Sequence, residues 1–234
     1  MKGDYSVKII VIVAIISLTF LLTLMQKFLK LLSRFDKKIF RTLEDKSIFV
    51  WSTIIIFAGL LGAKTFHIGR PIQGLDLSAN TIMVILLTMI PFWVFSGYKP
   101  GKNLKGILTF CFMFPIAEEI LFRGIIQSIA DSIMGANAVY IPIPVLKGVT
   151  LQVFISALCF GITHFQYFDF KFNTATVKKV LIAFLLGLFA GNIVELTNSI
   201  FYTVILHIVA NTGATLYYLI SSRENKTQKL DKIE

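Results

Sequence analysis

The feature that most constrains this chain is a succession of apolar stretches, each long enough for a helix that crosses a lipid bilayer. The hydrocarbon core needs about 20 apolar residues per helix, and inside it only helices or closed barrels satisfy their backbone groups. Helical length therefore predicts an all-α, polytopic transmembrane bundle of about seven spans, with six to eight allowed by the two shortest runs. The runs cover residues 7–25, 48–63, 78–97, 106–134, 145–164, 177–193 and 198–220.

The charges lie between these apolar runs. The chain is 56% hydrophobic and 15% charged, with a net charge of +10. A positive charge of this size is also typical of nucleic-acid-binding proteins, but Lys and Arg placed at the ends of apolar runs follow the juxtamembrane pattern instead. Because the sequence contains no nucleic-acid motif, it predicts a membrane surface as the partner of this charge and excludes nucleic acid.

The distribution of Lys and Arg also predicts an orientation. In a seven-span chain with its N-terminus outside, 17 of the 23 Lys and Arg residues fall in inside segments and five in outside segments, with Arg123 within a span. Inside segments carry the excess of positive charge in membrane proteins. The expected topology is therefore N-out/C-in.

A basic amphipathic helix is predicted at residues 26–47, after the first span. Phe28, Leu32 and Phe35 recur at helical spacing, while Lys30 and Arg34 fall on the opposite side. Such a helix is suited to the surface of an anionic inner leaflet. It implies a position on the membrane and no chemistry.

The chain is expected to form one membrane domain, and its Lys-, Ile- and Phe-rich composition indicates the plasma membrane of a bacterium. Residues 64–77 contain turn-forming Gly and Pro and predict a loop, with His67 a surface residue. Cys111 and Cys159 lie in apolar runs and are expected to be buried free thiols. The domain divides into N-terminal spans with the interfacial helix at 1–103, a core at 104–220 and a polar C-terminal tail at 221–234.

Two carboxylates and a guanidinium interrupt the fourth apolar run, at Glu118, Glu119 and Arg123. Ionisable groups at bilayer depth are costly, face the protein interior or a wet cavity, and mark functional sites. Glu119 and Arg123 are four residues apart and share a helix face, whereas Glu118 is rotated from Glu119 by about 100°. The spacing predicts a Glu119–Arg123 ion pair and a Glu118 that is left to take a proton. Taken alone, this run is equally consistent with a purely structural role.

Two further polar pairs lie in later apolar runs. Phe160 and His164 are one turn apart in the fifth run, and His207 and Asn211 are one turn apart in the seventh. A lone His or Asn in a membrane helix usually bonds a neighbouring helix and does nothing more. Here both pairs accompany an acidic pair, so we expect the fourth, fifth and seventh spans to enclose one water-filled pocket.

Such a pocket has the groups needed to hydrolyse a peptide bond. Glu118 with His164 can take a proton from water, and His207 and Asn211 carry donors suited to a developing oxyanion. No serine, cysteine or aspartate pair in the sequence competes for this role. Glu118, His164 and His207 also suit a three-ligand zinc site, which ranks second because the sequence has no HExxH motif. The expected cofactor is therefore none, with zinc as the alternative.

The three motifs together resemble the CAAX protease and bacteriocin-processing family, which includes the Rce1-type prenyl-protein proteases. The family pattern is EExxxR, FxxxH and HxxxN on separate transmembrane helices. The matching sequences here are EEILFR at 118–123, FGITH at 160–164 and HIVAN at 207–211. The resemblance covers about residues 104–220.

This resemblance implies a glutamate-dependent intramembrane endopeptidase that acts on a peptide or membrane-anchored protein. In the family pattern Glu118 and His164 activate water and His207 and Asn211 form the oxyanion site. Glu119, Arg123 and Phe160 are then supporting residues.

The resemblance leaves the substrate open. Some members trim the residues after a prenylated cysteine, while bacterial members are linked to propeptide maturation, bacteriocin immunity or signalling. A non-catalytic immunity or scaffold protein is one alternative. A proton-relay transporter is another, although the repeat and paired broken helices typical of transporters are not evident in the sequence. The oligomeric state is not predicted.

Overall fold

The computed structural model describes residues 13, 17, 19, 24, 47–63, 66–76, 78–95, 103–134, 140–141, 149–168 and 170–230. Apart from single positions, the expected first span at 7–25 and the expected amphipathic helix at 26–47 lie outside the described residues.

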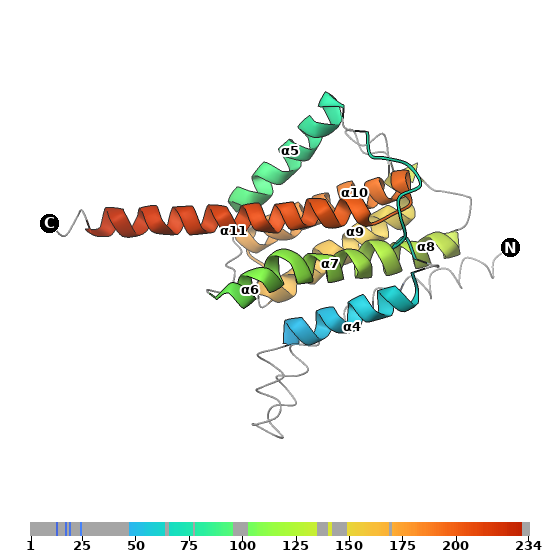
Figure 1. The fold of residues 1–234 in the computed structure, drawn as a ribbon, viewed down its shortest axis with the longest axis horizontal. Coiled ribbons are helices and arrows are strands. Elements are labelled where there is room, and N and C mark those ends of the chain that lie inside the picture. The colour runs from blue at the N-terminus through green and yellow to red at the C-terminus, as the bar shows by residue number, and fades with distance from the viewer. Residues whose placement is uncertain are drawn as a thin grey trace, which may run out of the picture.

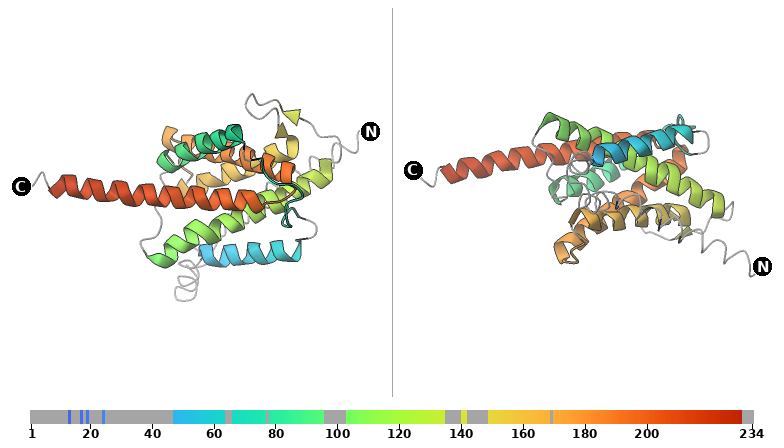
Figure 2. Two further views of the ribbon diagram at one scale, coloured as in Figure 1. Left: turned by 45° about the horizontal axis from the view of Figure 1, so that its top comes forward. Right: turned by 90° about the horizontal axis from the view of Figure 1, so that it is seen from below.

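The described chain is a bundle of helices with one short antiparallel ladder. Figure 1 and both views of Figure 2 show α11 as the longest helix, with its C-terminal part extending beyond the others. The first elements are α4 (Ser47–Leu61), α5 (Ala79–Phe95), α6 (Leu104–Leu108), η1 (Thr109–Met113), α7 (Phe114–Glu119), η2 (Ile120–Ile126) and α8 (Gln127–Met134). They are followed by β1 (Tyr140–Ile141), β2 (Val149–Thr150), α9 (Leu151–Thr163), η3 (His164–Phe168), α10 (Thr174–Thr197) and α11 (Phe201–Leu230).

The all-α membrane fold agrees with the sequence prediction, but the span count is not confirmed. Among the described residues, three helices are long and apolar enough to cross a bilayer by themselves: Leu151–Phe168, Thr174–Thr197 and Phe201–Ser222. The α4 and α5 helices are apolar but shorter. The seven spans and the N-out/C-in orientation stay predictions. The helix α11 continues through the polar segment after residue 220 to Leu230 because no Gly or Pro interrupts it.

Side-chain and backbone caps set the starts and ends of several helices. The Asn103 side chain accepts from the Gly106 N–H at the start of α6, and Asn173 does the same for Thr176 at the start of α10. Asn198 ends α10 in the left-handed conformation, with φ of 52°. Asparagine is favoured at both kinds of position, the N-cap of a helix and the left-handed residue at its C-terminal end.

A loop at residues 66–76 covers the turn between α10 and α11. The Ile200 N–H donates to the His67 carbonyl at 2.7 Å, and the Ile72 N–H donates to the Thr197 carbonyl at 2.9 Å. The Ser199 hydroxyl donates to the Gly69 carbonyl at 2.6 Å. The predicted loop is therefore present over its described residues, and its backbone fixes the start of α11.

The helices α9 and α10 pack closely because small residues line their contact. A Cβ at Gly187 would lie 2.9 Å from Ala157 Cα, and one at Gly161 would lie 2.9 Å from Phe184 Cβ. Small residues let membrane helices approach this closely where the surrounding lipid gives no hydrophobic drive to associate. The contact holds the end of α9, and with it Phe160 and His164, against α10.

Replacing Gly187 with Val is expected to lower the free energy of unfolding by about 1–3 kcal/mol, because the added carbons meet the α9 backbone. The measurement is the unfolding midpoint in mixed micelles titrated with dodecyl sulfate. Gly69→Val is the control, since nothing lies within 4 Å of a Cβ there. Equal midpoints for the two variants would contradict the close approach of α9 and α10.

Candidate functional site

The acidic motif lies in a continuous helical segment, α6 to α8, that changes its hydrogen-bond register twice. Both η1 and η2 are π-helical, and the Phe114 N–H donates to the Thr109 carbonyl five residues back. Pro115 follows and has no N–H to continue this pattern to the Phe110 carbonyl. That carbonyl accepts from Asn211 Nδ2 at 3.0 Å. Single π-turns of this kind are frequent at functional sites.

Glu119 and Arg123 form the predicted ion pair. Arg123 Nη1 lies 3.0 Å from Glu119 Oε1, and both residues are 1% exposed. The guanidinium also lies over the Phe160 ring, 4.2 Å from its centroid. His207 Nδ1 lies 2.8 Å from the same Glu119 oxygen. Glu119 is thus held by a cation and an imidazole, which compensates its removal from water.

Glu118 makes different contacts, as its rotation along the helix requires. The Tyr167 hydroxyl donates to Glu118 Oε1 at 3.2 Å. His207 Nε2 lies 3.5 Å from Glu118 Oε2. Glu118 is 2% exposed and lines the pocket. The expected separation of the two glutamates is therefore present, with His207 lying between them.

His164 is the first residue of η3, where α9 tightens into a 3₁₀ turn. Its Nδ1 lies 2.7 Å from the Phe160 carbonyl. Because a carbonyl only accepts, Nδ1 carries the proton in this contact, and in the neutral ring Nε2 carries the lone pair. The Phe160 ring meets the rings of His164 and His207 edge-on, with centroids 4.6 Å and 5.9 Å away. Phe160 thereby spaces the two histidines.

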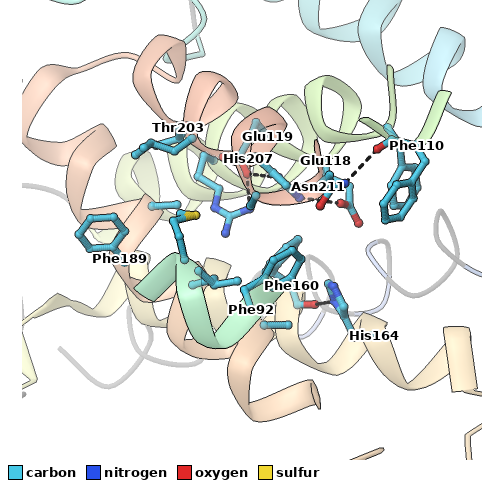
Figure 3. Close-up of a pocket in the computed structure, with 18 residues that line it drawn as sticks. Phe92, Phe110, Glu118, Glu119, Phe160, His164, Phe189, Thr203, His207 and Asn211 are labelled. Carbon is cyan, nitrogen blue, oxygen red and sulfur yellow. Dashed lines mark hydrogen bonds and ion pairs between the residues drawn. The ribbon is translucent and has the colours of Figure 1, made fainter. Parts of the chain in front are cut away.

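All seven residues singled out from the sequence line one pocket (Figure 3). They come from α7, η2, α9, η3 and α11, so the segments predicted as the fourth, fifth and seventh spans all contribute to it. The sequence analysis did not predict that α5 and α10 also contribute side chains to the pocket wall. Those walls are apolar, and such residues look like lipid-facing ones in a sequence. They include Met89, Phe92, Ala183, Leu186, Phe189 and Ala190.

The serine and cysteine side chains considered as alternative nucleophiles are buried. The buried Ser156 donates to the Phe122 carbonyl at 2.8 Å. Cys111 and Cys159 are free and buried, as predicted, and Cys111 Sγ lies 3.4 Å from Thr215 Oγ1. Among the described residues, no group of three His, Cys, Asp or Glu side chains is arranged to hold a metal ion. The pocket therefore offers two carboxylates, two imidazoles, an amide and a guanidinium for chemistry.

Comparison with known proteins gives one family. Residues 100–213 match the model of the family described as type II CAAX prenyl endopeptidase, Rce1-like. No curated protein and no solved structure matches the chain. The matched range contains the three motifs and every residue singled out from them.

Proposed function

We propose that this integral membrane protein is a glutamate-dependent endopeptidase of the CAAX-type intramembrane protease class, whose Rce1-like family model residues 100–213 match. One observation carries the proposal. Glu118 faces the pocket apart from the Glu119–Arg123 ion pair, in the company of His164, His207 and Asn211. A carboxylate outside the ion pair is the group that can accept a proton from water.

In the proposed reaction, Glu118 and His164 bind a water molecule beside the substrate carbonyl. Glu118 takes one proton as the water oxygen forms a bond to the carbonyl carbon. The tetrahedral intermediate then expels the amine, the C–N bond breaks, and Glu118 returns its proton to the leaving nitrogen. The new carboxyl group and the amine leave as products. This sequence needs no redox partner and no cofactor.

His207 and Asn211 are proposed to stabilise the oxyanion. Asn211 has two donors on Nδ2, and the Phe110 carbonyl accepts from one of them. The contact fixes the plane of the amide and leaves the second N–H for a substrate oxygen. The second donor is assigned to His207 Nε2, which lies 3.5 Å from Glu118 Oε2, while Nδ1 of the same ring lies 2.8 Å from Glu119 Oε1. Donors fixed in advance are the most effective form of this stabilisation.

The substrate we propose is a peptide or a membrane-associated protein. It would be either a CAAX-type chain end or a bacterial propeptide or bacteriocin-related precursor. The support lies in the pocket walls, where Phe92, Phe189 and Leu206 offer apolar surface to side chains from the bilayer. Anionic lipid of a bacterial plasma membrane is the proposed partner of the chain's basic segments.

The test is a cleavage assay on a fluorescent peptide library with the full chain in liposomes. His164→Ala is expected to lower kcat/KM by about a hundredfold or more, because the attacking water loses one of the two groups that hold it for proton transfer. Treatment of the wild type with 1,10-phenanthroline is expected to change nothing. Activity that is lost on chelation and restored by zinc would instead assign Glu118, His164 and His207 as metal ligands. An unaffected His164→Ala variant would contradict the assigned site.

A further inference from the structure

Tyr167 lies beside the proposed catalytic pair, although no motif contains it. It is three residues after His164, and both belong to the 3₁₀ turn η3. Side chains at positions i and i+3 eclipse one another on a 3₁₀ helix. The turn thus presents the Tyr167 ring on the same side as the His164 ring, whose centroid is 5.3 Å away at an interplanar angle of 89°. The spacing of the two residues is the sequence signal that identifies Tyr167.

The phenol reaches from η3 to α7. Its hydroxyl donates to Glu118 Oε1 at 3.2 Å. Its ring packs edge-on against Phe114, with centroids 5.9 Å apart. Tyr167 is half-buried. It is the phenol that the structure places on the proposed base.

We propose that Tyr167 is a positioning residue for the hydrolysis, an inference that rests on the proposed function. The hydroxyl occupies Glu118 Oε1 and holds the carboxyl group in one rotamer. The other oxygen, Oε2, is then directed toward His207 Nε2, 3.5 Å away. A base held in this way takes its proton from water along one direction, which is the geometric requirement for an efficient transfer.

The hydroxyl can be removed without disturbing the packing. Tyr167→Phe keeps the ring and therefore its edge contacts with Phe114 and His164. The matched control is Tyr217→Phe, which removes a hydroxyl from a side chain that is 46% exposed on α11. Any difference between the two variants then reports the bond to Glu118.

Tyr167→Phe is expected to lower kcat by about tenfold to a hundredfold, the size of a lost hydrogen bond to a charged group. KM and the unfolding midpoint of Tyr167→Phe are expected to stay at the wild-type values. In Tyr217→Phe, kcat, KM and the unfolding midpoint are all expected to stay at the wild-type values. In a Glu118→Ala background with measurable residual turnover, adding Tyr167→Phe is expected to cost much less, because each change removes the Tyr167–Glu118 hydrogen bond. A merely structural tyrosine would instead shift the unfolding midpoint and raise KM.

A second readout does not depend on turnover. The absorption difference between wild type and Glu118→Ala in the phenol band is expected to be present, and to vanish when both proteins carry Tyr167→Phe. A wild type that cleaves no peptide would contradict the proposed function, while this difference would still establish the Tyr167–Glu118 bond. Wild-type kcat in an active Tyr167→Phe enzyme, or no absorption difference, would overturn the inference about Tyr167.

Discussion

Glu118→Gln is expected to lower kcat/KM by about 10²–10⁴-fold while leaving the fold intact. Glutamine has the same shape as glutamate and can still accept the Tyr167 hydrogen bond through Oε1. Its amide cannot take a proton from water, and a general base contributes rate of this order. The isosteric exchange matters because Glu118 is buried, so a truncation would also open a cavity. The measurement is kcat/KM on the best peptide from the library, together with the unfolding midpoint.

Glu195→Gln is the matched control for this exchange. Glu195 lies near the end of α10, where it accepts a hydrogen bond from Thr150, and it does not line the pocket. Its variant is expected to cleave at the wild-type rate. Comparable cleavage by Glu118→Gln would remove Glu118 from the mechanism. If Glu118→Gln instead loses cleavage but still complements a deletion strain in vivo, the protein acts as an immunity or scaffold protein, since that role needs the bundle and not the base.

The polar residues that line the pocket could be predicted because a polar side chain within a membrane helix must face the protein interior or a wet cavity. An apolar run that carries Glu118, Glu119 and Arg123 must turn them inward. Helical spacing then pairs Glu119 with Arg123 and separates Glu118, and the structure has both features. Four-residue spacing likewise identified His207 with Asn211, and both line the pocket.

The parts of the site that were not predictable have no polar signal or depend on backbone register. Phe92 and Phe189 face the pocket, yet an apolar side chain is equally suited to lipid. The π-turns η1 and η2 change which residues share a face, and only Pro115 hints at them. Asn211 was predicted as an oxyanion donor, but nothing in the sequence indicated that its amide also donates to the Phe110 carbonyl in η1. The span count rests on run lengths, which do not fix where helices such as α4 and α5 end.

Removing the Arg123 guanidinium is expected to cost the largest amount of stability. Arg123→Met keeps most of the side-chain volume but leaves Glu119 as a buried charge without its cation. Breaking such a pair by removing one partner typically costs about 3–5 kcal/mol. The unfolding midpoint in mixed micelles titrated with dodecyl sulfate is expected to fall accordingly. Arg70→Met is the control, since Arg70 is exposed in the loop at residues 66–76.

The double variant Glu119→Gln/Arg123→Met separates charge from packing. It removes both charges, and the carbonyl oxygen of the introduced amide can still accept from His207 Nδ1 as Glu119 Oε1 does. If the loss in Arg123→Met comes from the unpaired carboxylate, the double variant recovers most of it, since neutral replacements of buried pairs are often tolerated. If it comes from the guanidinium over the Phe160 ring, the double variant stays as unstable as the single one. We expect recovery, because a bare buried charge costs more than a cation–π contact contributes.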